Sequence, residues 1–198
     1  MKSQDSLIEL SSGEYLDLLN PDPSVITPAV LAHHLSQANR FAGATSRPVS
    51  VVEHTLLVSK KLGADGESPL TILMGLHHDD PEAFIHDITR PLKDQIRELY
   101  GPIERLFENV IGEAMGFEIT GNQAVKDADE WALSCEAYYL MPSGGIGWWS
   151  EGLYDPIDSA QRAVAQWLIG NSNSYVKPSY LGAMWLRAHH ANMEASAF

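Results

Sequence analysis

The chain has 198 residues and a net charge of −13, with 44% hydrophobic and 20% charged residues. This length suits one well-buried domain, which we predict over residues 1–198, and the composition is that of an ordinary soluble globular protein. The acidic charge argues against a protein that binds long nucleic acid through a broad basic face, but it leaves room for a small phosphorylated ligand.

The predicted elements are almost all helical. Residues 1–24 form an extended, turn-rich lead-in, because Asn20-Pro21-Asp22-Pro23 favours turns. Thr27 followed by Pro28 is typical of a helix start, and we expect this helix to end near Gly43. Further helices are predicted over 51–62, 70–78, 102–115, 122–140 and 157–169, with a Gly/Trp-rich loop at 144–156 and a C-terminal helical extension at 176–198. The sequence therefore predicts an all-α, compact helical bundle.

No segment has the features of a membrane span or of a secretory signal. No apolar run approaches the roughly 18 residues that are needed to cross a bilayer. The first residues lack a basic region followed by an apolar run. The one cysteine, Cys135, excludes an internal disulfide framework and is expected to be a packed thiol. We therefore expect a cytoplasmic protein without a membrane partner.

A run of ionisable residues ends the predicted apolar helix 70–78, where charge is unfavourable unless something compensates it. Adjacent His78 and Asp79 can chelate one cation, and helical geometry returns Glu82 to the same face. Such a mixture of nitrogen and oxygen ligands suits Zn, Mn, Fe or Co. We expect His77 and Asp80 to be exposed partners of these ligands, with Asp80 capping the turn that follows.

Two residues elsewhere in the chain are candidates to complete the metal site. His54 lies on the predicted apolar helix 51–62, where the alternative is a hydrogen-bonded core histidine. Asp129 lies in the middle of a predicted helix, where a carboxylate is otherwise poorly placed, and Asp127 is its alternative. With an open position for water, a catalytic metal site would then have the ligands His54, His78, Asp79 and Asp129.

These residues resemble a known family. In their order on separate helices they match the H…HD…D signature of HD-domain phosphohydrolases. The segments SSGEYLDLLNPDP, LAHHLSQANRFAG, VSVVEHTLLVS, HHDDPEAFIHDITRPLK and VKDADEWAL look like successive blocks of the small bacterial and phage HD hydrolases of the 5′-deoxynucleotidase kind. The resemblance covers roughly residues 9–140, and the phage dATP triphosphohydrolases resemble this chain in particular.

The resemblance implies roles for residues around the metal. It implies that Glu82 acts beside the metal or as a general acid or base, and that Asp87 positions the nucleophile or protonates the leaving oxygen. It also implies that Arg40 and Lys93 contact phosphate, since a planar Arg fork and a point-charge Lys suit different phosphate oxygens. Phe41 would stack a nucleobase or sugar, and Pro91 would border the same pocket.

The function implied by the resemblance is metal-dependent hydrolysis of deoxynucleotides, above all dATP, with dADP and dAMP as further candidates. The products would be deoxyadenosine and phosphate or triphosphate. Zn, Co or Mn would activate the water, with Mg as an accessory ion on the phosphates. Family members suggest a homo-oligomer, either a dimer or a hexamer. The alternatives are a general 5′-deoxynucleotidase acting on dNMPs, a phosphodiesterase or alarmone hydrolase on the same fold, and a catalytically silent HD module that senses nucleotides.

Overall fold

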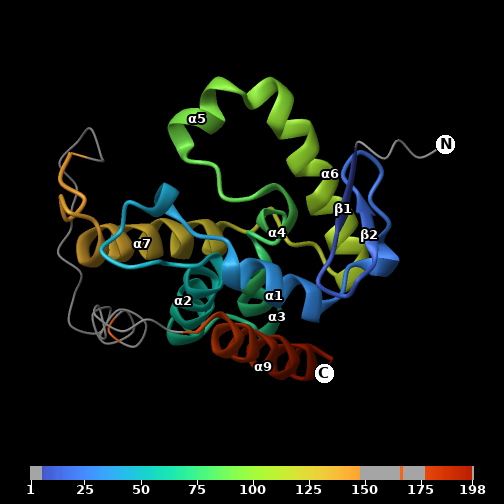
Figure 1. The fold of residues 1–198 in the computed structure, drawn as a ribbon. Helices are drawn as coiled ribbons and strands as arrows, with labels where there is room; N and C mark the ends of the chain where they lie inside the picture. Colours follow the sequence, from blue (N-terminus) through green and yellow to red (C-terminus); the bar gives the residue numbers. More distant parts are fainter. Residues whose placement is uncertain (1–5, 148–165, 167–176, 198) are drawn as a thin grey trace.

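The computed structural model describes residues 6–147, 166 and 177–197, and most of these residues are helical (Figure 1). The helices are α1 Pro28–Gln37, α2 Val51–Ala64, α3 Pro69–His77, α4 Glu82–Ile85, α5 Arg90–Gln95, α6 Arg97–Met115, α7 Gln123–Leu140 and α9 Pro178–Ser196. Within the described ranges, the sheet structure is one antiparallel hairpin of β1 Leu7–Glu9 and β2 Tyr15–Asp17. The prediction of an all-α helical protein is confirmed, with this hairpin as an addition inside the lead-in.

Local capping explains where the first long helices begin. Thr27 precedes α1, and its hydroxyl accepts a hydrogen bond from the backbone amide of Val30 at 3.3 Å. Ser50 precedes α2 and forms a reciprocal capping box with Glu53, in which each side chain accepts from the backbone amide of the other residue. Such bonds satisfy amides that the first helical turn leaves without partners, which is why short sequence patterns predict helix starts well.

The first helix is shorter than predicted, because it ends at Gln37 and not near Gly43. After it the chain runs extended, and the backbone amide of Arg40 donates to the carbonyl of Val49 at 2.8 Å. The next residue, Phe41, has a positive φ of 59°, which is uncommon for a residue that carries a Cβ. Backbone pairing with the segment just before α2 has therefore replaced the helical continuation and has changed the direction of the chain at Arg40 and Phe41.

The other predicted helices agree with the structure to within a few residues, except that α6 begins at Arg97 and contains Pro102. The predicted C-terminal helix is confirmed as α9. The predicted helix 157–169 and the loop beyond residue 147 lie almost wholly outside the described residues, and the single-domain assignment stays a prediction. Among the residues that the structure describes, no helix is both long enough and apolar enough to cross a membrane.

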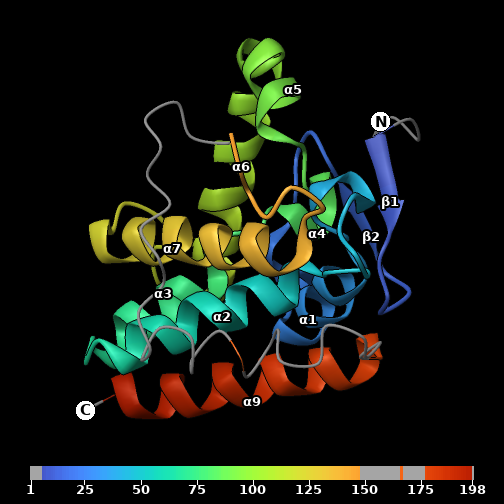
Figure 2. The ribbon, with the colours of Figure 1, turned by 90° about the vertical axis from the view of Figure 1, so that its left-hand side faces the viewer.

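Helices α2 and α3 lie at the centre of the packing. Helix α9 packs across α1 and α3, while α7 packs on the opposite side of α2, so that α7, α2 and α9 form successive layers in Figure 2. One apolar cluster joins α1, α3, α6 and α9, and a second joins α2 to α7. Cys135 lies buried in the second cluster, as expected for a packed thiol. Helices α5 and α6 form an arch above this bundle (Figure 1).

Candidate metal centre and its cleft

Two histidines from different helices meet at the centre of the molecule. His54 lies on α2 and His78 directly follows α3, and their ring centroids are 5.3 Å apart. Nδ1 of His54 donates to Oε1 of Glu136 at 3.1 Å, and Nδ1 of His78 donates to the carbonyl of Gly75 at 2.8 Å. When the rings are neutral with the proton on Nδ1, each ring presents the lone pair of Nε2. Metal-bound histidines are typically oriented in this way by a bond to their other nitrogen.

Both Nε2 atoms are buried and make no hydrogen bond within the described residues. They face carboxylate oxygens instead: Nε2 of His54 lies 3.0 Å from Oδ1 of Asp129 and 3.5 Å from Oδ2 of Asp79. Nε2 of His78 lies 3.3 Å from Oδ1 of Asp79 and 3.8 Å from Oδ1 of Asp129. Lone pairs that face anionic oxygens across such distances require a cation or a proton between them, so this donor set fits a metal ion.

The structure therefore brings all four predicted ligands to one place. The ligand atoms of His54, His78 and Asp129 lie within 4.8 Å of one another, a group that could hold a metal ion, and Asp79 lies beside it. Burial by itself raises the pKa of Asp79 and of Asp129. In their protonated form, His54 and His78 outweigh this effect and hold the pKa of both carboxyls well below the usual range. Both aspartates are accordingly anionic donors at neutral pH.

The sequence interpretation missed Glu136, the carboxylate that orients His54. It lies two helical turns after Asp129 on α7, and therefore on the same face of that helix. Its side chain is buried, and Oε2 lies 3.3 Å from Nε of Arg40. The spacing from Asp129 was a signal in the sequence, but only the packing of α7 against α2 shows that this face is buried.

Arg40 lies between two of these carboxylates. Its Nη1 is 3.3 Å from Oδ2 of Asp79, and its side chain is nearly buried. Burial opposes the positive charge, but the attraction of Glu136 and Asp79 outweighs burial and raises the pKa of Arg40. The guanidinium also lies over the ring of Phe41, 5.3 Å from its centroid. Arg40 is therefore a fixed cation that neutralises part of the acidic site and shapes its wall.

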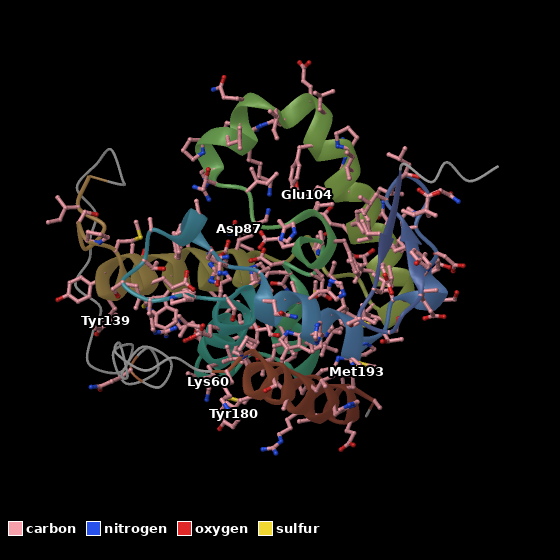
Figure 3. The ribbon with its side chains drawn as sticks, in the orientation of Figure 1. Lys60, Asp87, Glu104, Tyr139, Tyr180 and Met193 are labelled. Carbon is pink, nitrogen blue, oxygen red and sulfur yellow. The ribbon has the colours of Figure 1, made fainter. Side chains whose placement is uncertain are left out.

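A cleft of about 770 Å³ opens beside the two aspartates. It extends towards the arch of α5 and α6, and Figure 3 labels Asp87 below that arch. Every residue predicted to act in catalysis or in substrate binding lines the cleft, namely Arg40, Phe41, Glu82, Asp87, Pro91 and Lys93. The structure thus brings together residues from two segments of the chain, 40–41 and 82–93.

Glu82 and Asp87 have different surroundings within the cleft. Glu82 is largely buried, and its Oε2 has no hydrogen-bond partner within the described residues. Burial, and then the charge of Asp79, raise the pKa of Glu82 well above its usual value. Asp87 instead accepts a hydrogen bond from the backbone amide of Phe41 at 3.1 Å. Glu82 is therefore suited to carry a proton, whereas Asp87 holds the strained backbone at Phe41.

Lys93 faces the cleft but is already paired. Its Nζ contacts the carboxylate of Glu104 on α6 and lies 5.2 Å from the ring centroid of Tyr100. Burial lowers the pKa of Lys93, but the hydrogen bond and charge of Glu104 outweigh burial and raise it. Any anionic group that approached Lys93 would therefore compete with Glu104. Pro91 is exposed at the rim of the same cleft.

Fold and site together define a helical protein with a buried His/Asp group that could hold a metal ion. No known family profile matches the chain. It is 33% identical over 145 residues to the uncharacterized protein YfdR of Escherichia coli, a match that covers 72% of this chain and 77% of YfdR. It is also 37% identical over 93 residues to an uncharacterized protein of Rhodobacter capsulatus, covering 45% of this chain and 47% of that protein. The chain belongs to the same family as YfdR.

Proposed function

We propose that this chain is a metal-dependent phosphohydrolase of the HD type that acts on deoxynucleotides, above all on dATP. The proposal rests mainly on the two buried Nε2 atoms of His54 and His78. With the rings neutral, these atoms have no hydrogen-bond donor within the described part of the chain, and they face Asp79 and Asp129 beside an open cleft. A purely structural pair of core histidines would have its ring nitrogens satisfied, because unpaired buried polar atoms are costly.

A divalent transition metal held by His54, His78, Asp79 and Asp129 would supply a Lewis acid that polarises phosphate and lowers the pKa of water from about 15.7 towards 7. Two nitrogen and two oxygen ligands suit Zn, Co or Mn, with Mg as an accessory ion on the phosphates. In this proposal Glu82 exchanges a proton with the attacking water or with the leaving oxygen, because its raised pKa matches that task. Asp87 keeps Phe41 in place and is a second candidate for the proton transfer.

The cleft supports a nucleotide as the substrate. Its volume of about 770 Å³ lies within the range of roughly 300–1,000 Å³ found for small-molecule sites. Arg40 and Lys93 provide positive charge for phosphate, while Phe41 offers a ring face for a base or sugar and Pro91 borders the rim. The preference for adenine rests on the sequence resemblance to dATP triphosphohydrolases. The same proposal includes assembly of the chain into a homo-oligomer, either a dimer or a hexamer.

The substrate is tested by incubating the purified protein, loaded with Co²⁺ or Mn²⁺, with each dNTP and each dNMP. Chromatography of the products distinguishes deoxyadenosine with triphosphate from stepwise release of phosphate. We expect dATP to be consumed fastest. Equal turnover of all four bases would remove the dATP preference, and faster turnover of the monophosphates would favour a general 5′-deoxynucleotidase.

The metal site is tested with His78→Ala, and His190→Ala on the exposed face of α9 is the matched control. We expect His78→Ala to lose both bound metal and turnover, while His190→Ala retains both. Unchanged metal content and turnover in His78→Ala would refute the proposed enzyme. A wild-type protein that binds metal and nucleotide without any hydrolysis would instead favour a nucleotide-sensing module.

A further inference from the structure

His77 and Asp80 flank the ligands His78 and Asp79 on either side, and their surroundings differ from the sequence expectation. Both side chains are fully buried and not exposed, because α9 covers the end of α3. Asp80 does not cap the next helix either. The N-cap of α4 is Pro81, which makes no side-chain cap bond, and Oδ2 of Asp80 accepts from Nδ1 of His77 at 2.6 Å.

The hydrogen-bonded chain continues into the C-terminal helix. The Asp80 carboxylate accepts the hydrogen bond from Nδ1–H of His77. In a neutral ring, Nε2 of His77 is therefore left as an acceptor. Nδ1 of His189, on α9, lies 3.0 Å from it and donates the proton of this bond. The ring of His189 lies parallel to that of Trp185, with an interplanar angle of 1°. Three polar side chains thus form one directional line from the metal-binding turn into α9.

Trp185 makes a second bond from α9 to the same region. Its Nε1 donates to the carbonyl of Leu76 at 3.3 Å, and its side chain is fully buried. Carbonyl groups in the last turn of a helix have no partner inside the helix, so this bond satisfies one of them at the end of α3. The backbone is therefore held at Leu76 and the side chains at His77 and Asp80, immediately before and after the two ligands.

We propose that His189 is a positioning residue, through which α9 fixes the turn that presents His78 and Asp79 to the metal, while the Trp185 bond holds the same turn at Leu76. The inference rests on the proposed metal centre and goes beyond it, because it places part of the site's support about 110 residues further along the chain. An apolar contact between α3 and α9 would give packing energy alone. A line of directional bonds also fixes the rotation of the turn, and metal sites tolerate little displacement of their ligands.

The test is a Co²⁺ titration of the full-length chain, followed by the visible absorption of the bound ion. Four proteins are compared: wild type, His189→Leu, His189→Asn and His190→Leu. We expect His189→Leu to bind Co²⁺ about tenfold more weakly and with a changed spectrum, in line with the effect of outer partners on metal sites. His189→Asn restores the wild-type values, because its amide reaches the position of Nδ1. We expect His190→Leu, which replaces the exposed neighbour of His189, to leave the Co²⁺ affinity and the spectrum unchanged.

Unchanged Co²⁺ affinity and spectrum in His189→Leu would overturn the inference, even if that variant melted at a lower temperature. Nitrogen NMR of the wild-type imidazoles gives an independent check should the variant fail to fold. We expect His77 to carry its proton on Nδ1, and a proton on Nε2 instead would overturn the hydrogen-bonded line. The two proposals fail differently: a wild-type chain that binds no Co²⁺ removes the metal centre itself, whereas wild-type binding with an unaffected His189→Leu removes only the role of α9.

Discussion

Glu136 accepts a hydrogen bond from Nδ1 of His54 at 3.1 Å, although the two residues are 82 positions apart in the sequence. The same carboxylate lies 3.3 Å from Nε of Arg40, and Nη1 of that arginine lies 3.3 Å from Oδ2 of Asp79. One buried glutamate therefore orients a candidate metal ligand and compensates the charge of the arginine beside it. Because these groups are nearly or wholly excluded from solvent, removing any one of them affects the others.

Replacing Glu136 by Gln is expected to weaken metal binding by tenfold or more. The amide retains the shape of the carboxylate but loses the charge that makes the His54 ring a better donor to a metal. Affinity is measured by competition between the protein and a coloured chelator for Zn²⁺ or Co²⁺. Glu130→Gln, on the exposed face of the same helix, serves as the control. Equal affinity in both variants would contradict the assigned role of Glu136.

Replacing Arg40 by Met is expected to destabilise the metal-free protein by about 3–5 kcal/mol, because it leaves buried carboxylates without their counter-charge. The loss should be smaller with metal bound, since a cation next to Asp79 offsets part of the exposed negative charge. Urea denaturation with and without Co²⁺ measures both values. Arg187→Met, at an exposed position of α9, should change stability by no more than about 0.5 kcal/mol. A loss that is identical with and without metal would argue against electrostatic coupling.

Replacing Gly75 by Ala is expected to destabilise the protein by about 1–3 kcal/mol through overpacking. A Cβ at this position would lie 2.2 Å from Cδ1 of Leu62 and 3.2 Å from Cγ1 of Val58, both on α2. Gly63→Ala is the matched control, because its Cβ would meet only Cδ1 of Ile72 at 3.8 Å. That control should stabilise the helix by up to about 1 kcal/mol. Thermal denaturation compares the two variants, and a neutral Gly75→Ala would show that Leu62 can move aside.

The stability of the protein is expected to fall as the pH drops from about 6.5 to about 4, in part because of His189. Burial first, and then the charges of His77 and His190, lower the pKa of His189 in the folded chain to about 4. Since the unfolded chain takes up this proton at higher pH than the folded chain, acidification favours unfolding across that window. Melting temperatures of wild type and His189→Asn between pH 7 and pH 4 provide the measurement. The variant should lose less stability, and parallel curves for the two proteins would contradict the prediction.

Much of the fold was predictable because it depends on short-range chemistry. A hydroxyl before Pro28, a capping box at Ser50 and helical spacing of apolar residues fix the starts and the length of several helices within a few residues. The end of α1 was wrong for the opposite reason. The segment after Gln37 pairs with the backbone near Val49, and no residue pattern within the segment itself indicates this pairing.

The sequence by itself determined which residue types gather at the candidate site, because a His-Asp doublet at the end of an apolar helix needs compensation wherever the chain folds. Only the tertiary structure decided which face of each neighbouring helix is buried. That is why Glu136 was missed and why His77 and Asp80 were expected at the surface. Glu136 pairs with Arg40, and His77 forms a hydrogen bond with His189, so each partner comes from a distant segment of the chain. Burial and hydrogen bonding between such segments arise from packing and not from spacing along the chain.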